Sequence, residues 1–276
     1  MNQSMINSAV TMGQLQLKLD TTGNNLANVN TTGFKRSDTS FADLLFQQVN
    51  NQSAANQEVG RLTPNGIRVG SGAAVAQTAV RFEQGSISQS GREFDVALTE
   101  PGYFFELAET PGGDRQFTRD GAFYLSPNPN NNTQNFLVNS QGDYVLSAAG
   151  EPIELPSSYD DFQINEEGAI TVTLNDGTLV DAGQLQLVNI TKPQLLASIG
   201  ENNYVLPDLD ALDTDLADVL EEAAGAQVFM QSALETSNVD SAKEMTDMME
   251  AQRSYQFNSK AISITDQMMG LVTNLR

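Results

Sequence analysis

Hydrophobic residues at both ends of the chain recur at the spacing of long amphipathic helices. Towards the C-terminal end, alternating steps of three and four residues connect Met248, Ala251, Tyr255, Asn258, Ile262, Thr265, Met269 and Val272. This heptad period keeps one seam of a helix against a partner. Residues 241–276 contain no proline, and a continuous helix over them would span roughly 50 Å. Because a compact domain of this size does not need so long a helix, we expect the seam to face another element.

A second stripe near the N-terminal end connects Met5, Ala9, Met12, Gln16, Leu19 and Leu26. It ends in a turn that contains Asn28, Asn30 and Gly33, which are residue types that stop helices and form turns. The two stripes predict terminal helices that pair as an antiparallel coiled coil. The pattern leaves one alternative open, in which both helices pack on the central part of the chain.

The middle of the chain has the pattern of β structure. Short alternating or aromatic-rich runs lie between turn signals, at residues 94–98, 103–107, 122–125, 169–174 and 184–188. The sequence Asn175-Asp-Gly177 predicts a hairpin turn between two of these runs. The chain is therefore predicted to be α+β, with paired terminal helices and a mostly antiparallel β central body.

Two segments differ from this plan. Residues 36–75 are rich in Gln, Asn and Ser, which predicts a polar linker or insert. Residues 208–222 place Leu209, Leu212, Leu216, Val219 and Leu220 on one face of an acidic amphipathic helix, with Asp208 as its N-cap and Gly225 as its stop. The expected divisions are an assembly helix and turn (1–35), the insert (36–75), the β body (76–207), the acidic segment and connection (208–233) and a second assembly helix (234–276).

Composition excludes several classes of function. The chain has no Cys, His or Trp, which excludes disulfides, Cys/His metal sites and His-based catalysis. The sequence contains no run of 18 apolar residues, so no membrane span is predicted. It also lacks a basic region followed by an apolar region at its start, so no cleavable signal peptide is predicted. From these features we expect no catalytic residue, cofactor or metal.

The negative charge is concentrated in the middle of the chain. Residues 120–242 hold 20 Asp/Glu and one basic residue, Lys192, whereas the remainder holds 15 Asp/Glu and 13 Lys/Arg. An acidic body repels nucleic acid, so DNA or RNA binding is not expected. The distribution favours a solvent-facing layer carried on near-neutral ends that self-associate; the alternative is a generic acidic surface that maintains solubility.

Several motifs resemble those of bacterial flagellar rod and hook proteins. The N-terminal motif is Asn24-Asn-Leu-Ala-Asn-Val-Asn-Thr-Thr-Gly-Phe-Lys35. The C-terminal motifs are Leu234-Glu-Thr-Ser-Asn-Val-Asp240 and Met249-Glu-Ala-Gln-Arg-Ser-Tyr-Gln-Phe-Asn-Ser-Lys260. The resemblance extends inward through 82–87, 117–123 and 184–187, and residues 41–72 resemble an insert of the distal rod protein. The acidic segment after Pro207 departs from the family, which commonly has a Gly/Ser/Thr-rich connection there.

The resemblance implies a mechanical function. Copies of the chain would polymerise helically into a hollow drive shaft that transmits torque to the hook. The implied partners are further copies, neighbouring rod and hook proteins and the flagellar type III export apparatus. The implied location is the basal body, across the periplasm and cell wall, reached without a cleaved signal peptide.

The candidate assembly residues are the positions of the two seams and of the two signature motifs. In the motifs, Asn side chains are expected to satisfy backbone groups where a helix meets the following segment. The candidates are Met5, Leu19, Asn24, Asn25, Leu26, Asn28, Gly33, Phe34, Ser237, Asn238, Val239, Met248, Tyr255, Ile262 and Met269.

Two alternatives remain. The chain is a hook or proximal-rod subunit in the first alternative, and a peptidoglycan-acting enzyme in the second. The second rests on paired carboxylates such as Asp160-Asp161 and Glu166-Glu167, which are more commonly solvated charges on turns.

Overall fold

A computed structural model describes residues 2–43, 47–49, 67–69, 73–109, 113–129, 131, 133–200, 202–207, 215–223 and 225–274. The chain forms two compact units. The first, here called the helical unit, comprises Met1–Leu26, Ser37–Ala79 and Asp240–Arg276. The second, here called the body, comprises Ala27–Arg36 and Val80–Val239.

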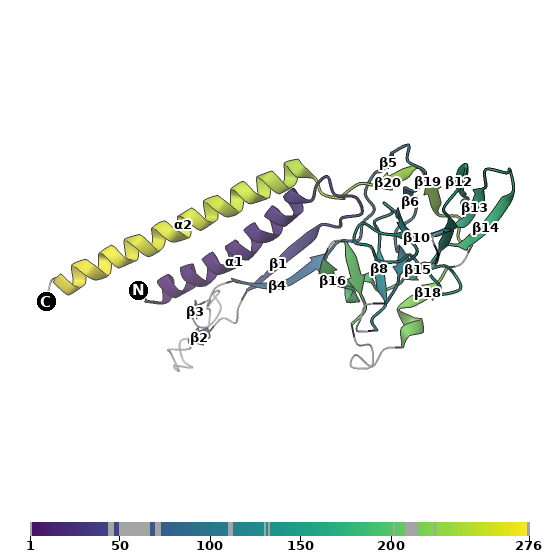
Figure 1. Ribbon diagram of the computed structural model, residues 1–276. Coiled ribbons are helices and arrows are strands. Elements are labelled where there is room, and N and C mark those ends of the chain that lie inside the picture. Colours follow the sequence, from purple (N-terminus) through teal and green to yellow (C-terminus); the bar gives the residue numbers. More distant parts are fainter. Residues whose placement is uncertain are drawn as a thin grey trace. The chain divides into compact units, whose positions relative to one another are not determined.

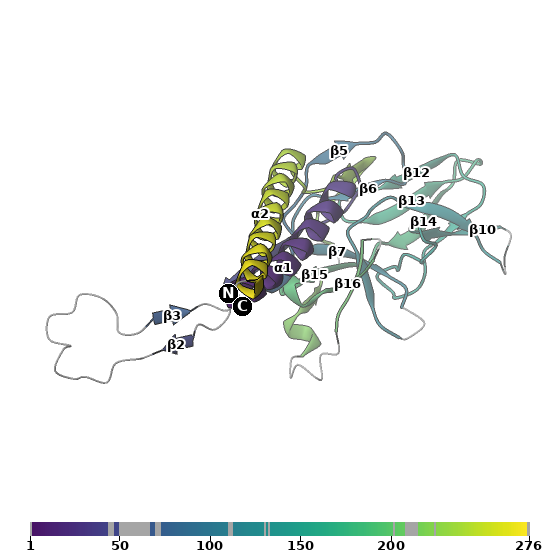
Figure 2. The same ribbon diagram turned by 90° about the vertical axis from the view of Figure 1, so that its left-hand side faces the viewer.

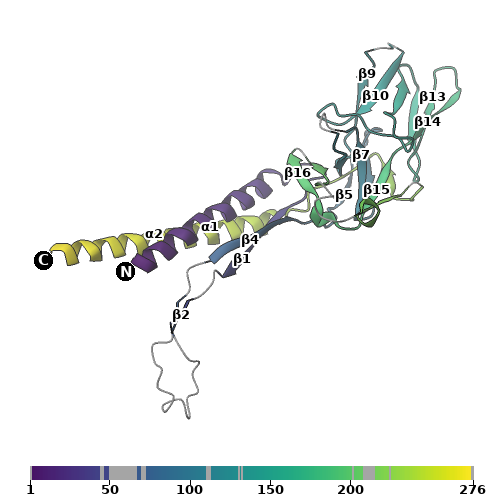
Figure 3. The ribbon, with the colours of Figure 1, turned by 90° about the horizontal axis from the view of Figure 1, so that it is seen from below.

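The helical unit contains the two long helices, α1 (Asn2–Ala27) and α2 (Ser241–Asn274). They run side by side in opposite directions in all three views (Figure 1, Figure 2, Figure 3). This confirms the predicted antiparallel pairing of the chain ends. Strand β1 (Ser37–Asp43) pairs with β4 (Ala73–Val80), and β2 (Gln47–Val49) pairs antiparallel with β3 (Ile67–Val69).

Burial along α2 follows the predicted seam. Ala251 and Thr265 are buried, and the other seam positions from Met248 to Met269 are half-buried; Val272 lies outside the residues whose side chains are described. The buried Thr265 donates its hydroxyl to the Ala261 carbonyl, so burial leaves no orphan donor. Asp240 caps the helix, because its Oδ1 accepts hydrogen bonds from the N–H groups of Ala242 and Lys243 at 3.0 and 3.2 Å.

The stripe predicted on α1 is wrong at two positions. Ala9 and Gln16 are exposed, whereas the polar residues Thr22 and Asn25 are buried. Hydrophobicity did not reveal these two because their polar atoms are satisfied locally. Thr22 donates its hydroxyl to the Lys18 carbonyl at 3.0 Å, and Asn25 bonds the backbone of Ser37 at the start of β1.

The body is built around a six-stranded antiparallel sheet. Its strand order is β16 (Ala197–Gly200), β17 (Asn203–Val205), β8 (Gln116–Thr118), β7 (Tyr103–Leu107), β15 (Leu187–Ile190) and β18 (Leu220–Glu222). Successive side chains of a strand point to opposite faces of a sheet. Phe104 and Val188 therefore enter one hydrophobic cluster, and Phe105 and Leu187 enter the other. The sheet is buried on both faces.

Smaller sheets surround this one. Strands β9 (Tyr124–Pro127), β10 (Gln134–Val138) and β11 (Glu154–Pro156) form one, and β12 (Asp161–Ile164), β13 (Ala169–Thr173) and β14 (Leu179–Gln184) form another. The predicted hairpin at Asn175-Asp-Gly177 is confirmed, because it joins β13 to β14 in antiparallel register. Two-stranded pairs complete the body: β5 (Ile87–Gln89) with β20 (Ala233–Glu235), and β6 (Val96–Leu98) with β19 (Phe229–Gln231).

The structure corrects one segment prediction and adds strands to another segment. The described part of the predicted acidic helix is a 3-10 turn, η4 (Leu216–Asp218), followed by strand β18; residues 208–214 lie outside the described residues. Val219 and Leu220 are both buried, and β18 is held by pairing with β15, which overrides the helical pattern. Within 36–75, predicted as a polar linker or insert, the described residues include strands β1, β2, β3 and the beginning of β4.

A proline-containing 3-10 turn, η2 (Pro193–Leu195), connects β15 to β16. None of the helices in the described residues is long and apolar enough to cross a membrane.

Candidate functional site

The N-terminal signature motif forms a tight turn after α1. The Thr31 N–H donates to the Asn28 carbonyl at 3.1 Å, and the Thr31 hydroxyl donates to Asn28 Oδ1 at 3.2 Å. Gly33 follows with a φ of +67°, and a Cβ there would lie 2.7 Å from the Asp120 nitrogen. Glycine is required at position 33 for two reasons. A residue with a side chain is strained at this φ, and its Cβ would collide with the backbone of Asp120.

Three hydrogen bonds fasten this turn within the body. The Thr32 hydroxyl donates to Asp120 Oδ1 at 2.9 Å, and Asn202 Nδ2 donates to the Thr32 carbonyl at 2.7 Å. The Gly33 N–H donates to the Glu235 carbonyl at 2.9 Å. Burial raises the pKa of Asp120, while its hydrogen bonds from Thr32 and Ala122 oppose the rise.

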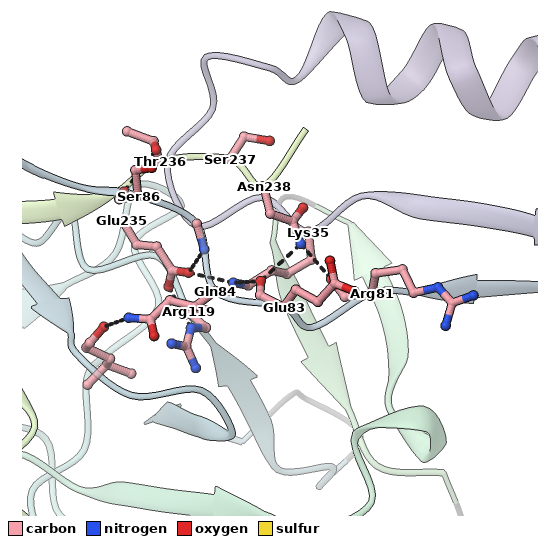
Figure 4. Close-up of polar contacts among 12 residues, drawn as sticks. Lys35, Arg81, Glu83, Gln84, Ser86, Arg119, Glu235, Thr236, Ser237 and Asn238 are labelled. Atoms are coloured by element: carbon pink, nitrogen blue, oxygen red, sulfur yellow. Dashed lines mark hydrogen bonds and ion pairs between the residues drawn. The ribbon is translucent and has the colours of Figure 1, made fainter. Parts of the chain in front are cut away.

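A buried ionic cluster lies next to the turn (Figure 4), and we call Lys35, Gly85, Arg119 and Glu235 the Glu235 node. Lys35 Nζ lies 2.6 Å from Glu235 Oε1, and Arg119 Nε lies 2.6 Å from Glu235 Oε2. The Gly85 N–H also donates to Oε1, at 2.7 Å. The charged side chains are at most 1% exposed. One carboxylate thus ties together three distant segments of the chain.

Backbone carbonyls accept further hydrogen bonds from the two cations. Arg119 donates to the carbonyls of Tyr103 and Glu100 at 2.9 and 2.7 Å, and Lys35 donates to that of Glu83 at 2.9 Å. Burial is the largest influence on the Lys35 ammonium and lowers its pKa, although the Glu235 carboxylate opposes the change. The node carries two cations and one anion, so its excess positive charge is compensated by carbonyl dipoles.

Gly85 in the node has no space for a side chain. A Cβ at this position would overlap the carbonyl oxygen of Thr236. The close approach lets the Gly85 N–H reach Glu235 while Thr236 donates its N–H to the Ser86 carbonyl at 2.8 Å. Residues 83–86 and 235–238 are therefore joined by both backbone and side-chain bonds.

Asn238 connects the same segments on the other side of the node. Its Oδ1 accepts a hydrogen bond from the Arg36 N–H at 2.8 Å. Its Nδ2 donates to the carbonyls of Arg81 and Glu83 at 2.8 and 3.0 Å. The amide supplies one acceptor and two donors at once. It satisfies backbone groups as the sequence analysis expected.

Asn25 performs a similar task inside the helical unit. Its Oδ1 accepts a hydrogen bond from the Ser37 N–H at 2.9 Å, and its Nδ2 donates to the Ser37 carbonyl at 2.8 Å. The side chain is buried. It offers β1 the donor and acceptor that a neighbouring strand would offer, and so joins the end of α1 to the start of β1.

The structure separates the candidate assembly residues into several places rather than one site. In the body, Gly33 and Asn238 border the Glu235 node, Phe34 is half-buried, and Ser237 Oγ accepts a hydrogen bond from the Val239 N–H at 3.3 Å. Asn28 closes the turn, and Asn24 is exposed on α1. The half-buried seam residues lie on the two helices: Met5, Leu19, Leu26, Met248, Tyr255, Ile262 and Met269.

Sequence reasoning missed Lys35, Arg119 and Glu235 as the central contacts. Lys35 and Glu235 each stand within a signature motif, but their pairing spans 200 residues. Lys35 is the single charge of its motif, but the motif of Glu235 also contains Asp240, and the segment 117–123 contains both Arg119 and Asp120. These charges do not show which of them pair.

The polar groups of the Glu235 node bond one another and the backbone around them. Both Glu235 oxygens accept hydrogen bonds from protein groups, and both cations donate to the carboxylate and to backbone carbonyls. Among the residues that the structure describes, no group of three or more His, Cys, Asp or Glu side chains is placed to hold a metal ion. The arrangement holds chain segments together.

Comparison with known families places these features in context. Residues 6–35 match the flagella basal body rod protein family, 101–172 match the flagellar hook protein FlgE/F/G D1 domain, and 230–275 match the flagellar basal body rod FlgEFG protein C-terminal family. The chain is also 39% identical to the flagellar hook-basal body complex protein FlhP of Bacillus subtilis, over the full length of both. The chain belongs to the flagellar basal-body rod and hook protein family.

Two further members of the family are similar along their whole length. The chain is 34% identical to the flagellar basal-body rod protein FlgG of Bacillus subtilis, with all of both chains covered. It is 34% identical to FlgG of Borreliella burgdorferi, covering 100% of this chain and 99% of the relative. The two terminal family regions contain the signature turn, Lys35, Glu235 and Asn238, so the Glu235 node lies where these regions meet the body.

Proposed function

We propose that this chain is a structural subunit of the bacterial flagellar basal-body rod, most like the distal rod, and that its copies polymerise helically into a hollow drive shaft. The full-length similarity to rod proteins and the antiparallel pairing of α1 with α2 support this function. The helical unit assembles the shaft in this proposal, and the acidic body forms its outer layer.

The observation that carries the proposal is a second apolar stripe on α2. Phe257, Ile264 and Leu271 recur every seven residues and are 69%, 56% and 65% exposed, on a face separate from the α1-facing seam. Met268 lies between the last two and is 44% exposed. An isolated subunit leaves this stripe in water, at about 25 cal/mol for each Å² of apolar surface. Helices of neighbouring copies bury it in the assembled shaft.

α1 carries exposed apolar residues as well. Ile6 and Leu17 are 57% and 50% exposed. Both helices therefore present apolar side chains beyond those used in their mutual pairing. A helix with apolar residues on more than one face suits a packed bundle, where it has several neighbours. This supports self-association through both chain ends.

The other partners and the location follow from family membership. We infer that the chain contacts neighbouring rod and hook proteins and passes through the flagellar type III export apparatus without loss of a signal peptide. It then resides in the basal body, across the periplasm and cell wall. The five divisions of the chain given under Sequence analysis keep these roles, with residues 37–79 assigned to the helical unit.

We also propose that the chain is not an enzyme. The paired carboxylates Asp160-Asp161 and Glu166-Glu167 lie at or beside strand β12, and both glutamates are exposed. The polar groups of the Glu235 node are used for internal bonds. The alternative structural role, a hook or proximal-rod subunit, differs in the curvature and position of the assembled polymer.

The proposal is tested by electron microscopy of the purified full-length chain at high concentration. We expect straight, hollow helical tubes, and Phe257→Asp should prevent them because a charge in the buried stripe has no partner. Ser259→Asp, at an exposed polar position of the same helix, is the matched control and should assemble normally. Curved filaments would favour the hook role, and hydrolysis of purified peptidoglycan by the chain would favour the enzyme.

A further inference from the structure

A groove of about 800 Å³ lies between two sheet edges of the body. One wall comes from β10, β11 and the residues before each of these strands, and the other comes from β14. β11 is the outer strand of the β11-β10-β9 sheet, and β14 is the outer strand of the β12-β13-β14 sheet. Figure 3 shows the β9–β10 and β13–β14 hairpins at the same end of the body. The volume is in the range of protein binding pockets, about 300–1,000 Å³.

The first part of the β14 edge offers backbone groups that no described residue bonds, whereas the Gln184 carbonyl accepts a hydrogen bond from the Ala148 N–H. Leu174 N–H bonds the Thr178 carbonyl at 2.9 Å, which fixes the phase of the antiparallel β13–β14 ladder. Bonded pairs alternate along such a ladder. The N–H and C=O groups of Val180 therefore point towards β13, whereas those of Leu179 and Asp181 point away from it.

The β11 edge is open in the same sense. The Leu137 N–H donates to the Ile153 carbonyl at 3.1 Å, and the Ser157 N–H donates to the Thr133 carbonyl at 2.9 Å. By the same alternation, Glu154 and Pro156 turn their backbone groups away from β10. Pro156 has no N–H, so this edge presents mainly acceptors.

The groove lining combines apolar and acidic side chains. Phe136 and Val180, which are half-buried, supply apolar surface, and the buried Ile153 lies behind it. The charged residues of the lining are Glu151 and Glu154 on one wall and Asp181 on the other, and all three are exposed. Among the residues that the structure describes, no lysine or arginine lines the groove. An occupant must match both the open strand edge and the negative charge.

We propose that this groove binds an extended, basic segment of another protein, which adds to β14 as a further strand. Main-chain hydrogen bonds to Leu179 and Asp181 would hold the segment, as in other strand-addition complexes. Its alternate side chains would contact the apolar surface, and its cationic side chains would face Glu154 and Asp181. The groove is separate from the helices assigned to polymerisation.

A second copy of this chain does not supply such a segment. Residues 120–242 contain one basic residue, Lys192. Lys35 and Arg119 are buried in the Glu235 node, and Arg115 is paired with Glu106 at 2.6 Å. Lys243, Arg253 and Lys260 belong to the helix α2. Among the other described residues, Arg36 and Arg92 are paired with Glu83 and Asp95, and Arg68 lies in β3, which is already paired with β2. The complementary charge is therefore assigned to a different protein.

The acidic residues also have a protective role that is consistent with this selectivity. Open strand edges of soluble proteins pair with one another unless charge or proline prevents it. Glu154, Pro156 and Asp181 keep the edges of two acidic bodies apart. The same charges attract a basic strand, so the groove favours positively charged segments over negatively charged ones.

The test is fluorescence anisotropy of the full-length chain with a labelled hexapeptide of alternating lysine and valine. We expect this peptide to bind at least tenfold more tightly at low salt than the matched peptide of alternating glutamate and valine. N-methylation of alternate peptide nitrogens in one register should abolish binding, and methylation in the other register should leave it. The measurement needs no polymer, so its failure is distinct from failure of the proposed rod function.

Variants of the protein connect the binding to the groove. Glu154→Gln with Asp181→Asn should weaken the lysine–valine peptide about tenfold and flatten its salt dependence. The Asn substitution retains the oxygen that accepts a bond from the Gly183 N–H at 2.9 Å. Asp218→Asn, an exposed site that does not line the groove, is the matched control and should bind as the parent does.

Three results would overturn the inference. They are equal binding of the two peptides, unchanged binding by the double variant, and equal binding by the peptides methylated in either register. Capture of soluble peptidoglycan fragments in place of the peptide would also overturn it, because the groove would then be a saccharide site.

Discussion

At the scale of single residues, Glu235 connects segments of the chain that are far apart in the sequence. Its carboxylate accepts hydrogen bonds from Lys35, Arg119 and the Gly85 N–H, and its carbonyl accepts one from the Gly33 N–H. The signature turn, the segment 83–86 and the end of β20 therefore meet at one side chain. Loss of the carboxylate leaves two buried cations facing each other.

We predict that Glu235→Gln destabilises the protein by about 3–5 kcal/mol, the usual result of removing one partner of a buried ion pair. The measurement is the free energy of unfolding in urea. Glu83→Gln is the control, because Glu83 pairs with Arg36 at 3.4 Å and its side chain is 69% exposed. It should change stability by less than about 1 kcal/mol. Equal effects of the two substitutions would contradict the assignment of the node.

A second prediction concerns the pH dependence of stability at Asp120. Burial raises its pKa in the folded state, so the folded protein disfavours the ionised carboxylate. This contribution to stability is therefore lost as the pH rises from below the unfolded pKa of about 3.9 through the higher folded value. Asp120→Asn keeps an oxygen acceptor for Thr32 and has no charge to bury.

We expect Asp120→Asn to be at least as stable as the parent at neutral pH, with its advantage shrinking as the pH falls towards 4. Urea unfolding over a pH series measures the difference. A growing advantage at acid pH would contradict the inferred direction of the pKa change.

The residue contacts were only partly predictable from the sequence. Amide side chains such as Asn25 and Asn238 were expected to satisfy backbone groups, because turns and helix ends leave such groups open, and the structure shows both doing so. The Lys35–Glu235 pair was not expected. Local patterns contain no information on which of many charges meet across 200 residues.

At the scale of elements, the two helices differ in how well their patterns predict burial. The α2 seam holds at every predicted position whose side chain is described, because one partner face sets a simple heptad. α1 contacts α2 through one face and also bonds β1 through Asn25, so its buried positions include polar ones. Strand pairing with β15 likewise overrode the helical spacing around Leu220.

Our prediction for the elements is that Ile262→Asp separates α1 from α2. An unpartnered charge in the seam costs several kcal/mol, more than one packing contact contributes. Circular dichroism should show loss of helix, and the cells should not swim. Leu26→Asp, on the opposing helix, should have the same effect. Cells that carry Glu167→Lys, a substitution in the body, should swim normally. Normal swimming by both seam variants would rule out the coiled-coil account.

At the scale of the whole molecule, the unit boundaries cut through the signature motif. Residues 27–36 belong to the body and residues 1–26 to the helical unit. A fragment of residues 27–239 without 37–79 keeps both Lys35 and Glu235 once Arg36 is joined to Val80 by a short glycine linker. The Arg81 N–H already bonds the Arg36 carbonyl at 2.8 Å, so this closure needs little chain.

We predict that this fragment is a soluble, folded monomer that lacks the helices needed for assembly. Size-exclusion chromatography with light scattering gives its mass, and urea unfolding should show one cooperative transition. The same fragment with Glu235→Gln should be markedly less stable. Aggregation of the parent fragment would show that the body needs the helical unit to fold.

The most direct test of rod function is electron cryotomography of basal bodies in the parent organism with and without this chain. The account predicts that deletion leaves a shortened rod without a hook, and that the parent chain restores both. Phe257→Asp should fail to restore them, although its subunit remains folded, and Ser259→Asp should succeed. Full-length rods with normal hooks in the deletion strain would contradict the central claim.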